Sequence, residues 1–248
     1  EMGRGMRDAF DMLDNADLKL GEIEDEDGET VALTHGNFQS LLQNYDRRVR
    51  QDAFNTYYKA YESHQYTYST LLAGSIKKDL FYSRAKKFSS YRAKALFSEN
   101  IPVEVHDNLL KSVQQSLDPL YKYFDLRKRL LELDELHMYD CNVPLVKDMK
   151  WHMPFEQAAE EIKSALKPLG GEYVEQLGRG LSVDRWTDRY ENKGKRSGAY
   201  SSGCYDSNPF ILMNYREDNI NSAYTLAHEA GHSMHSFYSR KNQPYLYS

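Results

Sequence analysis

The sequence predicts a mainly α-helical protein with one small β element. Two observations predict this fold class. Apolar and aromatic residues recur at three- and four-residue steps over most of the stretch 36–190, which is the period of a helix with one buried face. By contrast, the glycine-rich segment 193–203 cannot form a stable helix. With 248 residues the chain can bury a sizeable core, and we expect one domain over 1–248.

Composition excludes several classes of function. The net charge of −5 gives no electrostatic footprint for nucleic acid or an anionic membrane surface. No segment approaches the ~20 apolar residues that span a bilayer. We therefore expect neither nucleic acid nor a membrane as a partner. The two cysteines, Cys141 and Cys204, are best interpreted as reduced thiols, which predicts a cytoplasmic protein.

The first stretch, 1–35, is expected to form a lead-in helix and a β-hairpin. Residues 18–23 and 30–34 flank an acidic turn whose Asp27-Gly28 pair favours a positive φ angle. The acidic turn could attract a cation, but it lacks the ligand spacing of a calcium loop. An exposed hairpin tip is the preferred interpretation.

The second stretch, 36–190, is expected to be helical. Asp46 is a candidate N-cap, and breaks are expected near Ser89 and at Asn100 to Pro102. An apolar stripe predicts one long packed helix in which Pro119 makes a kink rather than an end. The residues of this stripe are Leu110, Val113, Leu117, Leu120, Phe124 and Leu131.

The remaining helices of this stretch follow a connecting loop. Pro154 is expected to open a helix, because proline suits the first helical turn. The inner side of this helix would carry Phe155, Ala158, Ala159, Ile162 and Leu166. A shorter helix is expected over 169–177, ending near Gly178.

The last stretch, 191–248, is expected to hold the β element and a long helix. Residues 210–213 form an apolar run after Pro209, which predicts a short buried strand. This strand could pair with the glycine-rich segment that precedes it.

The long helix carries a metal-binding motif, His228-Glu229-Ala230-Gly231-His232. Residues four apart share one face of a helix, so both imidazoles can reach one metal ion. Neutral imidazole suits zinc, which lowers the pKa of a bound water towards ~7. Glu229 lies about 100° around the helix from His228 and can take the proton from that water.

A catalytic zinc site needs a third protein ligand, and the motif holds only two. His235 lies about 10.5 Å along the helix axis from His228, too far to share the ion, and is expected to line the site or to make a structural hydrogen bond instead. A third His six residues after His232 is also ruled out, because that position is Tyr238. The remaining arrangement uses a Glu from a following helix, and no Asp or Glu follows Glu229 in this sequence.

At these residues the chain resembles oligoendopeptidase F, in the wider family that includes thimet oligopeptidase. The segment 228–235 reads HEAGHSMH, which is similar to that family's H-E-x-G-H-x-x-H form. The resemblance continues in three further segments, GKRSGAYSSG at 194–203, LDELHMYD at 133–140 and ADLKLGE at 16–22.

The resemblance implies a zincin-like helical metallopeptidase fold, with this chain as a partial catalytic domain. It implies an endopeptidase for short peptides with one Zn²⁺ per complete active site. His228 and His232 would be the zinc ligands and Glu229 the general base. Residues 198–200, which are Gly198, Ala199 and Tyr200, would pair with the substrate backbone, although a plain loop beside the site is the alternative.

The same resemblance implies a third ligand beyond residue 248, a Glu roughly 25 residues after His232. The chain would then be a central fragment whose partner is the C-terminal segment of the same protein, and by itself it would be inactive. Two alternatives remain open at this point. The chain could bind peptides without hydrolysing them, or it could be a helical scaffold whose motif has no function.

Overall fold

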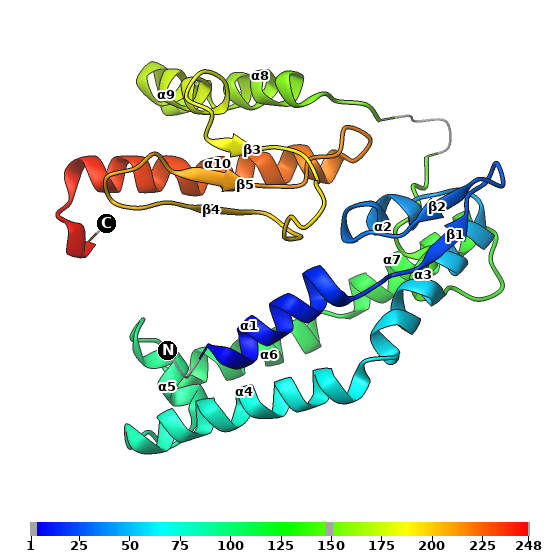
Figure 1. Ribbon diagram of the computed structural model, residues 1–248, viewed down its shortest axis with the longest axis horizontal. Helices are drawn as coiled ribbons and strands as arrows, with labels where there is room; N and C mark the ends of the chain where they lie inside the picture. Colours follow the sequence, from blue (N-terminus) through cyan, green and yellow to red (C-terminus); the bar gives the residue numbers. More distant parts are fainter. Residues whose placement is uncertain (1–3, 147–150, 248) are drawn as a thin grey trace. The chain divides into compact units, whose positions relative to one another are not determined.

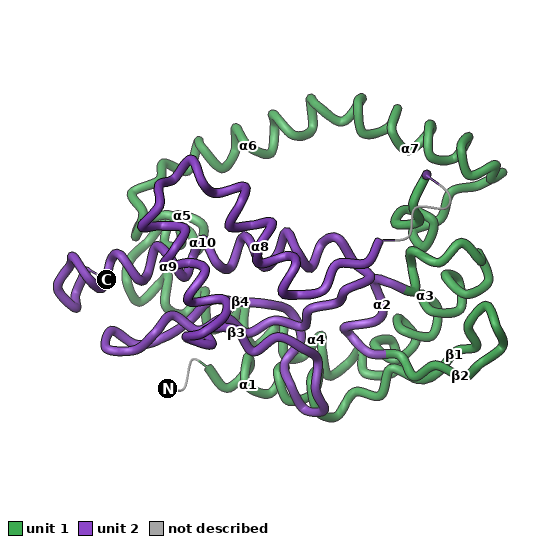
Figure 2. The backbone as a smooth tube through the Cα atoms, turned by 90° about the horizontal axis from the view of Figure 1, so that it is seen from above, with its two compact units in different colours: residues 1–33, 41–145 green, residues 34–40, 146–248 purple. Residues whose placement is uncertain are grey.

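The computed structural model describes residues 4–146 and 151–247 (Figure 1). The chain divides into two compact units, residues 1–33 with 41–145 and residues 34–40 with 146–248 (Figure 2). Each unit has an apolar core of its own. The single domain expected from the sequence stays a prediction. Within the described ranges, no helix has both the length and the apolar character needed to cross a membrane.

The first unit begins with the expected helix and hairpin. Helix α1 (Gly5–Met12) continues into a π-helical turn (Leu13–Asp17). Strand β1 (Glu22–Glu24) then pairs antiparallel with β2 (Thr30–Ala32). The prediction for the first stretch is thereby confirmed.

Helix α3 (Arg47–Glu62) packs against this hairpin. The Asp46 side chain accepts a hydrogen bond from the Arg48 N–H at 2.9 Å, which confirms Asp46 as the N-cap. The helix buries its apolar face under β1, and this contact forms the core of the unit. The buried residues of that core are Leu18, Leu20, Ile23, Leu33, Val49 and Ala53.

Four helices follow in the first unit: α4 (Gln65–Ala85), α5 (Tyr91–Phe97), α6 (Val103–Gln115) and α7 (Asp118–Leu130). The two expected breaks are confirmed. Ser90 caps α5 by accepting a hydrogen bond from the Ala93 N–H, and Asn100 takes a positive φ of 53° before α6.

The prediction of one long helix through Pro119 is wrong. Helix α6 ends at Gln115 and α7 starts at Asp118, so Pro119 lies in the first turn of a new helix. A proline there removes no helical hydrogen bond, because the first turn has no acceptor for its N–H. The expected packing of the stripe is not observed either, since Leu110 and Val113 are 51% and 53% exposed.

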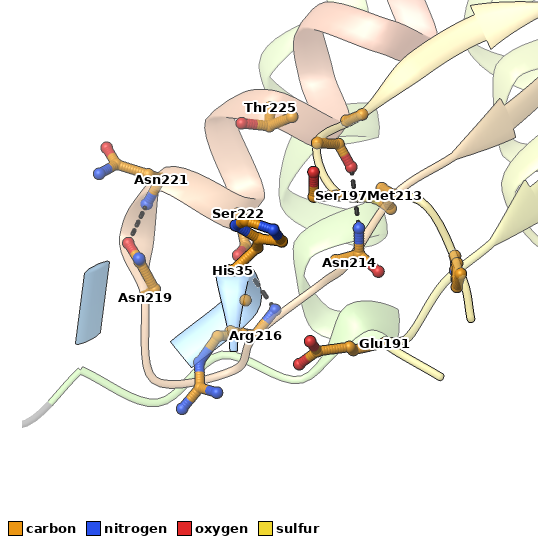
Figure 3. Close-up of a pocket in the computed structure, with 14 residues that line it drawn as sticks. His35, Glu191, Ser197, Met213, Asn214, Arg216, Asn219, Asn221, Ser222 and Thr225 are labelled. Carbon is orange, nitrogen blue, oxygen red and sulfur yellow. Dashed lines mark hydrogen bonds between the residues drawn. The ribbon is translucent and has the colours of Figure 1, made fainter. Parts of the chain in front are cut away.

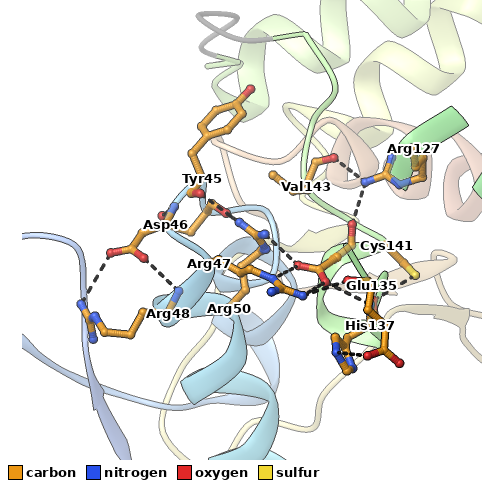
Figure 4. A network of polar contacts seen from close by, with 12 residues as sticks. Tyr45, Asp46, Arg47, Arg48, Arg50, Arg127, Glu135, His137, Cys141 and Val143 are labelled. Atoms are coloured by element: carbon orange, nitrogen blue, oxygen red, sulfur yellow. Dashed lines mark hydrogen bonds and ion pairs between the residues drawn. The ribbon is translucent and has the colours of Figure 1, made fainter. Parts of the chain in front are cut away.

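A buried carboxylate joins α3 to the short 3₁₀ helix Met138–Asp140 (Figure 4). Asp140 is fully buried and pairs with Arg50 at 2.8 Å and with Arg47 at 2.9 Å. Its carboxylate also accepts a hydrogen bond from the His137 N–H at 3.0 Å. The buried Arg127 of α7 donates to the Asp140 and Val143 carbonyl oxygens. One side chain thus holds two segments that are about ninety residues apart in the sequence.

In the second unit, α8 (Phe155–Ala165) begins directly after Pro154, as expected. Its buried residues are Phe155, Ala158, Ala159 and Ile162. A 3₁₀ turn (Lys167–Leu169) leads to α9 (Gly171–Leu181). The expected end near Gly178 is wrong, because α9 continues to Leu181.

Glycines inside α9 are explained by close packing rather than by a helix end. Trp186, which is 1% exposed, lies against Gly180 so closely that a Cβ atom there would collide with its ring. At Gly178 the Lys163 side chain occupies the equivalent space.

The β element is a three-stranded sheet with the order β3-β5-β4. Strand β5 (Phe210–Leu212) runs antiparallel to β4 (Tyr200–Ser202), which confirms the expected pairing, and parallel to β3 (Thr187–Asp188). The sheet lies along α10 (Ile220–Asn242), the last long helix, which precedes a 3₁₀ turn at Tyr245–Tyr247 (Figure 1). Helix α2 (His35–Leu41) contributes residues 35–40 to this unit.

Candidate active site

Helix α10 fixes the direction of the motif side chains. Its first turn is capped by Asn219, whose side chain accepts a hydrogen bond from the Asn221 N–H at 2.9 Å (Figure 3). Leu226, Ala230 and Met234 are at most 1% exposed and pack into the core of the unit. Because these residues hold one face of the helix inward, the face that carries His228 and His232 is exposed.

The two motif histidines converge on one point. Their Nε2 atoms lie 3.1 Å apart, and the rings meet edge to face with centroids 4.7 Å apart. Two nitrogens that each lie ~2.0–2.1 Å from one tetrahedral zinc ion would be about 3.3 Å from each other. The observed separation of the two Nε2 atoms is close to this value.

Glu229 lies between the core and this pair. The residue is only 8% exposed, and its carboxylate has no hydrogen bond or ion pair with any other described residue. Two imidazole donors and a carboxylate without a protein partner fit an ion with a bound water, which the carboxylate can face.

His235 is not part of the convergent pair. It is exposed, on the same helix but three residues after His232. Among residues 4–146 and 151–247, no group of three or more His, Cys, Asp or Glu side chains could hold a metal ion. The third ligand, expected as a Glu, stays a prediction.

Strand β4 offers a free backbone edge beside α10. The Ile211 N–H donates to the Trp186 carbonyl at 2.7 Å, so the polar backbone groups of Ile211 point towards β3. The backbone N–H and C=O groups of successive residues in a strand point to alternate sides. Those of Phe210 and Leu212 therefore point to the opposite side from Ile211 and bond to β4. Ser201, which is paired with Ile211, therefore directs its N–H and C=O away from the sheet.

The two residues that precede Ser201 show the same alternation between the faces of the sheet. Ala199 packs against the core of the unit, whereas the Tyr200 side chain is 42% exposed on the other face of the sheet. Gly198 has a φ of 84°, which favours glycine, and its carbonyl accepts a hydrogen bond from the Asn214 amide at 3.0 Å (Figure 3). Of the three residues predicted to contact substrate, Gly198 and Ala199 directly precede β4 and Tyr200 is its first residue.

A cavity of about 290 Å³ lies beside the first turns of α10, between Gly198 and Thr225 (Figure 3). Two cations in its lining are already paired. Lys195 contacts Asp188 at 3.1 Å, and Arg216 contacts Asp218 at 2.8 Å. The hydrogen bonds from Arg216 lower the pKa of the Asp218 carboxyl. The lining includes Gly198 and Ala199, the two residues directly before β4.

Three residues of this region were missed by sequence reasoning: Asn214, Ser201 and Ser233. Asn214 holds the backbone before β4, and the Ser201 Oγ lies 2.8 Å from the Ser233 Oγ. Ser233 is fully buried although it directly follows His232. A serine at a core position of a helix was the one available signal, because such a hydroxyl requires a partner.

Comparison with known proteins places this geometry in a family. The model of peptidase family M3 matches residues 40–248. Oligopeptidase PepF of Bacillus subtilis is 50% identical over 238 residues, which are 96% of this chain and 35% of that protein. Oligoendopeptidase F of Enterococcus faecium is 40% identical over 72% of this chain and 33% of its own, with a TM-score of 0.59.

A more distant solved structure shows the fold alone. PZ peptidase A, determined with an inhibitor, is 17% identical, with a TM-score of 0.81 over 96% of this chain and 42% of its own. The mainly helical architecture with a small sheet beside α10 is thus shared with that structure. The chain belongs to peptidase family M3. It spans 35–39% of the length of the curated relatives that it matches.

Proposed function

We propose that this chain is part of a zinc-dependent endopeptidase that hydrolyses short oligopeptides. The convergence of the His228 and His232 Nε2 atoms, 3.1 Å apart on an exposed helix face, carries the proposal. Membership of peptidase family M3 and the similarity to oligopeptidases support it. The expected cytoplasmic location belongs to the same proposal.

The two histidines would hold one zinc ion through their Nε2 atoms. When bound, zinc polarises the scissile carbonyl and makes a coordinated water acidic enough to attack near neutral pH. Glu229 would take the proton of the attacking water, because its carboxylate is next to the pair and has no protein partner. The same carboxylate would then deliver that proton to the leaving amine.

The substrate backbone would pair with the free edge of β4. The Ser201 N–H and C=O point outward there, so an extended peptide can add as a further strand. Gly198, Ala199 and Tyr200 would lie along this peptide, and His235 would line the site further along α10. Backbone pairing of this kind requires an extended peptide, which favours short unstructured substrates over folded proteins.

The third zinc ligand is proposed to be a Glu from a segment outside residues 1–248. A site with two histidines leaves the remaining coordination positions to water and lacks a ligand charge to offset the cation. Residues 1–248 alone are therefore proposed to be inactive.

The proposal is tested with the full chain of the protein and a set of short unstructured peptides. We expect cleavage within the peptides, loss of cleavage with a chelator, recovery with zinc, and one zinc per active site. Peptide binding without cleavage, in the presence of stoichiometric zinc, would favour the non-catalytic binder instead. Absence of both zinc and peptide binding would favour the scaffold.

A further inference from the structure

We propose that the hydrogen bond between Ser201 and Ser233 sets which peptide bond is cleaved, by fixing the substrate-binding edge relative to the metal-binding helix. This inference rests on the proposed peptidase function. Ser233 is fully buried in α10 and directly follows His232. Its Oγ lies 2.8 Å from the Oγ of Ser201, the central residue of β4.

Ser201 contacts α10 through its side chain and faces the edge of the sheet through its backbone. Its backbone N–H and C=O point to the free edge, where a peptide would pair, while its side chain points to α10. A peptide bonded to this backbone is therefore connected to the residue after His232 through one side-chain contact. Among residues 4–146 and 151–247, no other side-chain hydrogen bond joins β4 to α10.

The polar pair also selects the register of a very short strand. Strand β4 has three residues, and a slip by one residue would turn Ser201 to the opposite face. If the slip put Tyr200 in the place of Ser201, the Ser233 hydroxyl would be buried without a serine partner, which costs free energy. The same slip would turn the Ser201 N–H and C=O towards β5 and remove them from the edge. The serine pair thus penalises this slip, which would misplace the substrate.

A hydroxyl in a helix often bonds to the carbonyl of the preceding turn. Ser233 instead uses its hydroxyl across the packing interface with β4. We therefore describe both serines as positioning residues. Neither hydroxyl is required to touch the reacting atoms.

The experiment uses the full chain with Ser201→Ala, Ser233→Ala and the double variant. Zinc content, kcat, KM and thermal unfolding are measured, and the cleavage products of one peptide are identified by mass spectrometry. Ser202→Ala is the matched control, because Ser202 lies next to Ser201 in β4 with an exposed side chain. Ser201→Thr keeps the hydroxyl and serves as the conservative rescue.

Both single variants should keep their zinc, lose about 10- to 100-fold in kcat/KM, and cleave at additional neighbouring bonds. The threonine variant should restore the single cleavage position, and the Ser202 control should match the parent protein. The double variant leaves no hydroxyl unpaired, so it should regain stability relative to the single variants without regaining a single cleavage position. Stability that recovers in the double variant while the cleavage position stays altered would show that the serines position the substrate, beyond any effect on stability.

Unchanged kcat/KM and one unchanged cleavage position in both single variants would overturn the inference. Loss of stability and activity together, with both regained in the double variant, would overturn it as well. A parent protein that shows no zinc-dependent cleavage would contradict the proposed function and this inference together. A cleaving parent with unaltered variants would contradict only the inference.

Discussion

At the scale of single residues, Glu229 and the two histidines have different surroundings on the same helix. Both histidines are exposed, whereas Glu229 is 8% exposed and has no partner among the described side chains. Under the proposed function, the histidines would hold the ion and Glu229 would take a proton. Substitutions of the histidines and of Glu229 should therefore affect metal content and cleavage rate differently.

Replacing either histidine with alanine in the full chain should abolish stoichiometric zinc and peptide cleavage together. One imidazole alone cannot hold the ion in the preformed geometry of the pair. Metal content by atomic emission and cleavage of a fluorogenic peptide provide the measurements. His235→Ala is the matched control and should keep its zinc. Retained zinc in both His228→Ala and His232→Ala would move the site elsewhere.

Glu229→Gln should keep the zinc but lose about 10²–10⁴-fold in kcat. The amide preserves the shape of the side chain and cannot accept the proton from the attacking water. Metal content and single-turnover cleavage rates separate the two effects. If this variant loses the metal as well, Glu229 is a ligand or a structural group rather than a base.

At the scale of secondary-structure elements, local patterns predicted much of the fold. The Asp46 cap, the helix after Pro154 and the spacing of His228 and His232 each depend on residues within one or two turns. Strand β3 was missed because two residues, Thr187 and Asp188, carry no periodicity. The contact between Ser201 and Ser233 joins segments 32 residues apart, and no local pattern encodes their relative register.

The errors have equally specific causes. The apolar stripe keeps its helical phase across the gap between α6 and α7, so spacing alone could not separate a kink at Pro119 from a new first turn. Glycine at 178 suggested a helix end, but there it makes room for a side chain of the neighbouring helix. Both errors depend on how the helices pack against each other, which the spacing of residues in the sequence does not reveal.

Asp140 supports a prediction about the junction between α3 and the 138–140 turn. Asp140→Asn removes the charge that faces the buried Arg50, and a broken buried pair costs about 3–5 kcal/mol. The free energy of unfolding, measured with urea, should fall by that amount at pH 7. Asp125→Asn is the control, since Asp125 is exposed, and should change it by less than about 0.5 kcal/mol.

The same pair gives a dependence on pH. Burial raises the pKa of the Asp140 carboxyl, but hydrogen bonds from Arg47, Arg50 and the His137 N–H together lower it below its ordinary value. A lowered pKa in the folded state contributes stability above the unfolded pKa of about 3.9, and this contribution is lost as the pH falls through the folded value. The difference in unfolding free energy between the parent and Asp140→Asn should stay constant from pH 7 to 5. It should shrink below about pH 4, and a constant difference down to pH 2 would contradict this account.

At the scale of the whole molecule, the chain spans 35–39% of the length of its curated relatives. The described residues provide two converging histidines and no third side chain to complete a metal site. Metal affinity and activity should therefore depend on more than residues 1–248.

Residues 1–248 alone should bind zinc weakly and should not cleave peptides at a measurable rate. Two histidines without a carboxylate leave the charge of the ion uncompensated, and missing supports around metal ligands commonly cost 10–100-fold in affinity. Titration calorimetry with zinc on residues 1–248 and on the full chain of the protein measures the difference in affinity. Tight stoichiometric zinc in the shorter chain would show that a residue within it completes the site.

The shortness of β4 has a consequence for solubility. An open strand edge is a template on which other chains can pair and aggregate. With three residues and a glycine, Gly203, directly after it, β4 exposes too short a ladder to bind another copy firmly. Under the proposed function, an edge this short would let a peptide pair briefly and leave, and it would also limit self-association.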